Sequence, residues 1–210
     1  MVHADPWLLN LAEDRRRGIS LIWPIEWVNP QEWLDLQGEM KALLPEQYHY
    51  PLEDLHLTVL TIISCVEDYA ALEIKTSDYV EVIRKAFESS DVEQLVFEGL
   101  AATHAAWLMC GYSELGGLER IRARVRKEMH ASGLYHTMDK RYLLNTAHST
   151  LGRFQKEMDG EMGGQFWAFL QKWKFKALPA VKPISKMQLV ENDWYMRRGK
   201  VNVLESFSIG

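Results

Sequence analysis

Strand-like runs of apolar and β-branched residues alternate along this chain with segments of helical periodicity, and this alternation limits the possible folds more than any other feature. In the first half we expect strands at 19–23, 55–64 and 94–100, and helices at 30–45 and 79–87. In the second half we expect strands at 105–110, 142–151, 185–191 and 201–209, a turn at 197–200, and helices at 118–129 and 166–173. The pattern predicts an α+β protein with two related lobes that correspond to the two halves of the chain.

No stretch is rich enough in glycine or proline to act as a linker between separate domains. We therefore expect one bilobal domain over residues 1–210. The first 17 residues suggest a leading helix of unclear role, ended by Gly18. The glycine-containing stretch at 160–164 is expected to form a surface loop.

Composition excludes several classes of protein. Hydrophobic residues make up 47% of the chain and charged residues 25%, which are ordinary values for a folded globular protein. The apolar run at 57–63 falls far short of the ~20 residues that span a bilayer, and the first residues begin no secretion signal. We therefore expect a cytoplasmic monomer without membrane contact.

The charge balance argues against an extended nucleic-acid surface, because 24 Lys and Arg against 29 Asp and Glu give a net charge of −5. A basic run at 120–127 scatters its charges around a helix and is interpreted as a solvated helix face. A small anionic ligand held in a pocket remains possible. The two cysteines, Cys65 and Cys110, are too few for a disulfide framework or a cysteine-built zinc site, so both are expected to be buried, reduced thiols.

Two of the seven histidines occur in matching contexts. His56-Leu57-Thr58 lies within the expected strand 55–64, and His148-Ser149-Thr150 lies within or at the end of the expected strand 142–151. Because side chains alternate between the two faces of a strand, the histidine and the threonine of each tripeptide emerge on one face. Each motif thus offers an imidazole beside a hydroxyl, and the two motifs occupy comparable positions in the two halves.

Two other interpretations are open at this point. A single histidine in an amphipathic strand is more often a hydrogen-bonded, half-buried residue than a catalyst. The same histidines would also suit a metal, but no carboxylate or third histidine recurs at ligand spacing on either strand. The pairing of the two motifs favours catalysis or phosphate binding over both alternatives.

The residues that flank each motif extend the pattern: Leu55-His56-Leu57-Thr58-Val59-Leu60 in the first, and Ala147-His148-Ser149-Thr150-Leu151-Gly152-Arg153 in the second. Both segments resemble the His-x-Thr/Ser motifs of the 2H phosphoesterase superfamily, which includes bacterial 2'-5' RNA ligase-like proteins and cyclic phosphodiesterases. The closing segments 187–190 and 203–209 are similar to the final hairpin of that family. The resemblance covers residues 18–209 and departs from the family at Ser149, where relatives usually have an apolar residue.

This resemblance implies a bilobal α+β fold in which two antiparallel sheets with flanking helices form a central groove, the lobes being related by a pseudo-twofold axis. His56 and His148 would then act as general base and general acid on opposite sides of phosphorus. Thr58 and Thr150 would donate hydrogen bonds to the non-bridging oxygens. Such chemistry requires no metal and no cofactor.

Two further side chains are expected to bind the substrate. Arg153 offers a planar donor fork for phosphate, although a solvent-exposed salt bridge would explain this residue nearly as well. Tyr195 lies beside a polar turn and is the candidate for stacking on a base. Trp23, Trp107 and Trp194 could also stack on a base, but core packing is the expectation for most of them.

These residues suggest a metal-independent phosphodiesterase that hydrolyses a 2',3'-cyclic phosphate on a small nucleotide or an RNA terminus. The alternative is a nucleotide- or RNA-end-binding module that has kept the groove with little or no turnover. Product formation from a 2',3'-cyclic nucleotide in excess chelator distinguishes the two.

Overall fold

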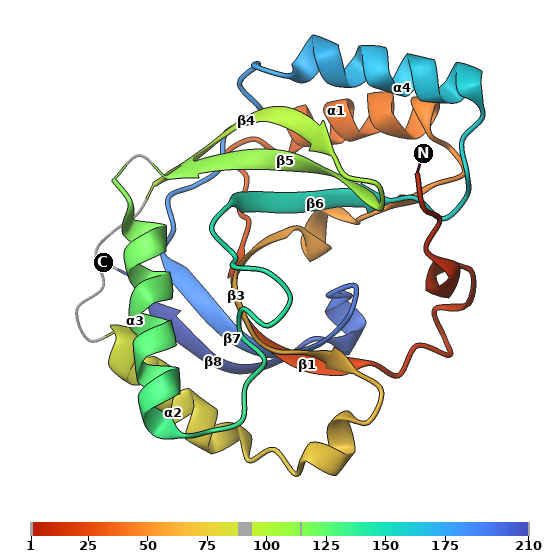
Figure 1. The fold of residues 1–210 in the computed structure, drawn as a ribbon. Coiled ribbons are helices and arrows are strands. Elements are labelled where there is room, and N and C mark those ends of the chain that lie inside the picture. Colours follow the sequence, from red (N-terminus) through yellow and green to blue (C-terminus); the bar gives the residue numbers. More distant parts are fainter. Residues whose placement is uncertain (1, 88–93, 114, 210) are drawn as a thin grey trace.

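Within the residues that the structure describes (2–87, 94–113 and 115–209), the computed structural model contains two four-stranded antiparallel sheets (Figure 1). The first sheet has the strand order β3 (His56–Val66), β1 (Arg17–Pro24), β7 (Lys186–Asp193) and β8 (Asn202–Ser208). The second sheet has the order β2 (Tyr48–His49), β6 (Ala147–Arg153), β5 (Ala106–Ser113) and β4 (Leu95–Ala102). The expected α+β class with two antiparallel sheets is confirmed.

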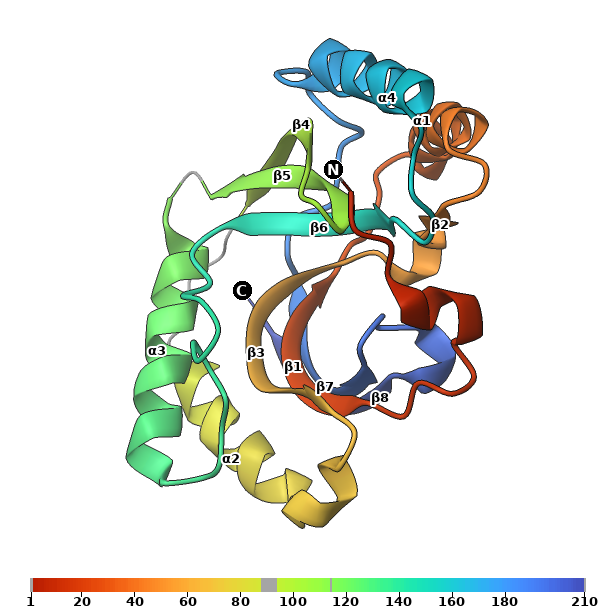
Figure 2. The same cartoon turned by 45° about the vertical axis from the view of Figure 1, so that its right-hand side comes forward.

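The helices form two pairs on different sides of the molecule. Helix α1 (Pro30–Leu43) contacts α4 (Gly160–Trp173), which lies against β4 of the second sheet. Helix α2 (Thr76–Phe87) contacts α3 (Gly117–Ser132) and β8, and α3 contacts β3, as Figure 2 shows from a second direction. None of the described helices combines the length and the apolar character that crossing a membrane requires.

The two sheets are interleaved in sequence, so the expectation that each lobe corresponds to one half of the chain is wrong. Strands β7 and β8, from the end of the chain, complete the sheet that β1 and β3 begin. The reason lies in β1, whose residues 18–23 are all buried. A strand buried along its length needs neighbours on both edges, and β3 and β7 supply them.

Three expected elements differ from those observed. The leading helix is only a short 3₁₀ helix, Pro6–Asn10, and the chain beyond it is held by the Asp14 carboxylate, which accepts hydrogen bonds from Arg16. The stretch 160–164 is the first turn of α4, because Asp159 caps it by accepting a hydrogen bond from the backbone N–H of Met162 at 2.7 Å. The strand expected at 142–151 begins only at Ala147, and the preceding residues form a loop.

A continuous apolar core fills the space between the sheets and their helices. Trp23 and Trp107 belong to this core, as expected from the sequence. The two sheets meet where β3 contacts β6, the strands that carry the two His-x-Thr motifs. The fold therefore brings the two motifs to a single junction.

We expect Gly152→Ala to destabilise the protein by about 1–3 kcal/mol, because overpacking a filled core forces neighbours to move. Gly152 lies opposite Trp107 in the pairing of β5 with β6, and an added Cβ would overlap the Trp107 indole. Trp107 is completely buried and has no room to retreat. Urea unfolding monitored by circular dichroism measures the change.

Gly163→Ala in α4 is the matched control, because a Cβ there would meet no atom within 4 Å. Alanine at a helical position should stabilise the protein slightly, by roughly 0.5–1 kcal/mol. If the two variants unfold at the same urea concentration, the packing of Gly152 against Trp107 is not as described.

Candidate active site

A pocket of ≈ 210 Å³ lies at the junction of the two sheets and is lined by residues of β1, β3 and β6, by the loop before β6, and by residues 192–196. All six side chains singled out in the sequence line this pocket: His56, Thr58, His148, Thr150, Arg153 and Tyr195. The fold therefore collects residues from positions 56 to 195 around one space.

Strand alternation turns the two motifs toward the pocket. On β3, His56 and Thr58 are half-buried at the pocket, while Leu57 between them is fully buried in the core. On β6, His148 and Thr150 behave in the same way, and Ser149 points inward with 1% of its surface exposed. The inward direction of Ser149 explains why an apolar residue would suit that position.

The His56 ring is held in a defined orientation. Its Nδ1 lies 2.8 Å from the backbone carbonyl of Asp54, which can only accept, so Nδ1 carries a proton and donates it. Among the described residues no hydrogen bond to Nε2 is formed. Burial lowers the pKa of His56 below 6.5, and positive charge on Arg153 and His148 adds to this effect.

The His148 ring is anchored through the same nitrogen. Its Nδ1 lies 3.2 Å from the Thr146 hydroxyl, which can donate or accept. Burial lowers the pKa of His148 below 6.5, and the guanidinium of Arg122 lowers it further. Both imidazoles thus favour the neutral form more strongly than a free histidine does.

The Arg153 side chain extends into the pocket from the end of β6. Its Nε donates to the Tyr50 hydroxyl at 3.1 Å, and its guanidinium carbon lies 5.6 Å from the centre of the Tyr195 ring. No carboxylate among the described residues forms an ion pair with it, which argues against the alternative of a solvent-exposed salt bridge. The guanidinium is therefore available to an anion.

Tyr195 does not fit the role expected from the sequence. Its side chain is 0% exposed, and its hydroxyl donates to the Asp5 carboxylate at 2.8 Å. A base has no access to a ring buried in this way. Trp194, expected in the core, is only half-buried and lines the pocket, and Tyr142 lines it with 66% of its surface exposed.

The sequence pattern did not single out Tyr142 and favoured the core for Trp194, because both residues lie in irregular segments without periodicity. The Trp194 ring is flanked by Arg16 at 4.6 Å and Arg141 at 5.5 Å from its centre. Arg141 itself lines the pocket. The part of the pocket lining around Trp194 is thus aromatic and cationic.

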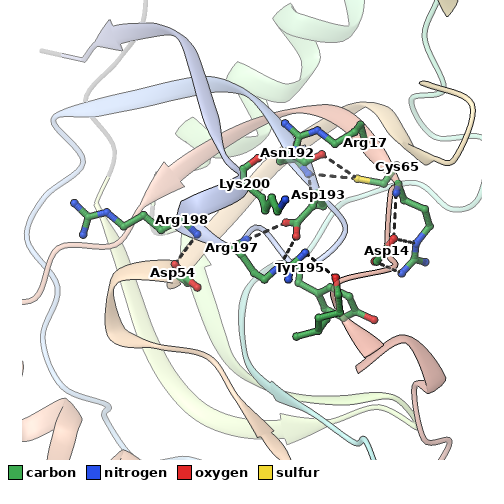
Figure 3. Close-up of polar contacts among 12 residues, drawn as sticks. Asp14, Arg17, Asp54, Cys65, Asn192, Asp193, Tyr195, Arg197, Arg198 and Lys200 are labelled. Atoms are coloured by element: carbon green, nitrogen blue, oxygen red, sulfur yellow. Dashed lines mark hydrogen bonds and ion pairs between the residues drawn. The ribbon is translucent and has the colours of Figure 1, made fainter. Parts of the chain in front are cut away.

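A polar network fixes the segment that carries Trp194 and Tyr195 (Figure 3). The Asp193 carboxylate accepts from the backbone N–H of Arg197 at 2.9 Å and from the side chain of the same residue. The Asp54 carboxylate accepts from the backbone N–H of Arg198 at 2.9 Å, while its backbone carbonyl orients His56. The turn after β7 is thereby tied directly to the residue that orients the first histidine.

The pocket is more positive than the chain as a whole. Arg141 and Arg153 line it, and Asp139 supplies the one carboxylate among the described lining residues. That carboxylate is neutralised by Arg126, whose Nε lies 2.6 Å from it. An anion would therefore meet two arginines and no free carboxylate, even though the whole chain has a net charge of −5.

Neither a metal site nor a thiolate stands out at this pocket. In the part of the chain that is described, no group of three or more His, Cys, Asp and Glu side chains is arranged to hold a metal ion. Cys65 lines the pocket, and burial raises the pKa of its thiol to about 12. Both cysteines are free, but they are half-buried, so the expectation of full burial is wrong in degree.

No family model matches the chain, and no curated protein matches its sequence. Solved structures match its fold. The chain is similar to the protein ATU0111 of Agrobacterium tumefaciens, with a TM-score of 0.59 and 13% identity over 92% of this chain and 87% of that one. It is similar to a phosphoesterase with a TM-score of 0.54 and 11% identity, over 90% of this chain and 98% of that one.

A third similar structure is that of E. coli LigT complexed with 3'-AMP, with a TM-score of 0.52 and 13% identity over 93% of this chain and 98% of that one. LigT has also been solved with ATP and with NADP+. At these identities the likeness is one of fold. LigT and the phosphoesterase each match at least 90% of the chain, so the shared fold extends over nearly all of it.

Proposed function

We propose that this protein is a metal-independent phosphodiesterase that hydrolyses a 2',3'-cyclic phosphate on a small nucleotide or an RNA terminus. One observation carries the proposal: a single pocket combines an imidazole and a hydroxyl from β3 with an imidazole and a hydroxyl from β6. Two strands from different sheets can flank one phosphorus, as in-line displacement requires.

The reaction needs one neutral and one protonated imidazole. The neutral ring takes a proton from water as the water oxygen bonds to phosphorus. The bond from phosphorus to one ribose oxygen breaks, and the protonated ring gives its proton to that oxygen. The products are a phosphomonoester and a free hydroxyl, and proton exchange with solvent restores the two rings.

The remaining lining residues suit the charge that develops on the phosphoryl group. The Thr58 and Thr150 hydroxyls can donate to the non-bridging oxygens, and Arg153 adds a permanent positive charge. Losing one such preorganised donor typically reduces turnover by about 10²-fold or more.

The aromatic residues of the pocket lining are the proposed place for the nucleoside. Tyr142 presents an exposed ring, and the half-buried Trp194 also lines the pocket. Aromatic rings accept any base by stacking, at about 1–3 kcal/mol per base. The nucleotides held by LigT, 3'-AMP and ATP, support a ligand of this class.

We expect His56→Ala and His148→Ala each to reduce turnover of a 2',3'-cyclic nucleotide at least ~10²-fold, because each removes one proton-transfer step. The double variant should have a turnover rate only slightly lower than that of either single variant, since both groups act in the same transition state. Excess EDTA should leave the wild-type rate unchanged. Rates are measured by chromatography of the phosphomonoester product.

His104→Ala is the control, because His104 is exposed between β4 and β5 and does not line the pocket. If the wild-type protein binds the cyclic nucleotide saturably but forms no product, the protein is a binding module and not an enzyme. If activity disappears in EDTA and returns with added metal, the nucleophile is bound to a metal and the two-histidine mechanism is wrong.

The dependence of kcat/KM on pH should be a bell whose maximum lies below pH 6.5. Raising the pH removes the proton that the acid needs, and lowering it protonates the base, so activity falls on both sides. Because the pKa values of both His56 and His148 are lowered from 6.5, both limbs move to lower pH. The two apparent pKa values that the limbs report belong to the coupled pair of histidines and not to either residue alone. Initial rates at low substrate concentration between pH 4 and 9 test this, and a plateau above pH 7 would contradict it.

A further inference from the structure

Arg122 on α3 is a buried cation that contacts both motif-bearing segments. Its Nε donates to the backbone carbonyl of Val59 at 2.7 Å, and its Nη2 donates to the carbonyl of Thr146 at 2.8 Å. A longer contact of 3.4 Å joins Nη2 to the carbonyl of Thr58. The residue is 1% exposed, so the interpretation of the basic run 120–127 as a solvated helix face is wrong at this position.

These acceptors lie directly beside the catalytic candidates. Thr58 belongs to the first motif, and Val59 follows it on β3. Thr146 immediately precedes β6, and its hydroxyl lies 3.2 Å from Nδ1 of His148. One planar guanidinium therefore fixes the backbone of the first motif relative to the residue that anchors the second histidine.

Stability alone gives a poor account of this arrangement. Burying a guanidinium is costly, and burial lowers the pKa of Arg122 to about 10, which still leaves it charged at neutral pH. The nearest carboxylate is that of Glu119, whose Oε1 lies 4.0 Å from Nη1 and whose side chain is half exposed. Apolar residues that share the buried face of α3, such as Ile121 and Val125, show that an apolar side chain would suit this face.

We propose that Arg122 is a positioning residue that holds the two His-x-Thr motifs at the separation and orientation that phosphoryl transfer requires. This inference rests on the proposed function for its catalytic consequence, while the spacing itself is a property of the fold. Displacing a reacting group by about 1 Å can cost 10²-fold in rate, so small movements of β6 relative to β3 matter.

The guanidinium also acts on His148 through its charge. It adds to the effect of burial in lowering the pKa of that imidazole. The other groups that face His148 are Cys110, its partner on β5, and His56 across the pocket. Burial raises the pKa of the Cys110 thiol, which is therefore neutral, so Arg122 is the fixed charge near His148.

Arg122→Lys and Arg122→Met separate these two effects. Lysine keeps the charge but lacks the fork, and it should lower kcat about 10²-fold while leaving KM within a few-fold and the pKa of His148 nearly unchanged. Methionine removes charge and donors together, so it should lower kcat at least as much and also raise the pKa of His148. Lys127→Met, an exposed charge on the same helix, should change none of these values.

Steady-state kinetics with a 2',3'-cyclic nucleotide gives kcat and KM, and NMR titration of the imidazole signals gives the pKa of His148. Circular dichroism and the wild-type NMR fingerprint show which variants are folded. If the methionine variant fails to fold, the lysine variant still tests the geometry through kcat. Wild-type kcat and an unchanged pKa of His148 in a folded Arg122→Met protein would overturn the proposal.

The test remains informative if the proposed function fails. If the wild-type protein binds inorganic phosphate but shows no turnover, the proposed hydrolase function is wrong. The positioning role of Arg122 is then measured by the affinity for phosphate. Arg122→Lys should then weaken phosphate binding about 10-fold or more, because both motifs must contact one anion. Unchanged affinity in that variant would overturn the positioning role on its own.

Discussion

The contact between β3 and β6 is the constraint on which the candidate site depends. Around each motif burial alternates, with Leu57 inside on β3 and Ser149 inside on β6, so the register of each strand within its own sheet, β3 on β1 and β6 on β5, decides which side chains reach the pocket. A shift by one residue would bury both histidines and expose core residues. The same apolar burial that stabilises the lobes therefore fixes the direction of the polar side chains.

The electrostatics of the pocket differ from those of the whole protein. A chain with a net charge of −5 has no general attraction for polyanions, yet its pocket is lined by Arg141 and Arg153 while its single described carboxylate is occupied by Arg126. Arg122, which is buried on α3, contributes further positive charge next to β3 and the segment before β6. This distribution suits a small anion held locally better than a long nucleic acid.

Local periodicity was enough to predict the α+β class and the placement of His56 and His148 on strands, because alternation of burial is encoded residue by residue. The interleaving of the sheets was not predictable in this way, since it depends on β7 returning to pair with β1. The burial of Arg122 and Tyr195 also depends on partners far along the chain, Val59 for one and Asp5 for the other. Charged and aromatic side chains carry no local signal that separates a buried position from an exposed one.

The most direct test of the central claim is a crystal structure of the protein with bound vanadate, which adopts the five-coordinate geometry of a phosphoryl group under in-line attack. We expect vanadium in the pocket between the two strands, with Nε2 of His56 and Nε2 of His148 facing opposite apical oxygens. The hydroxyls of Thr58 and Thr150 should lie about 2.5–3.0 Å from the equatorial oxygens. Vanadate bound by one motif only, or with both imidazoles on one side of the metal, would contradict two-histidine acid–base catalysis.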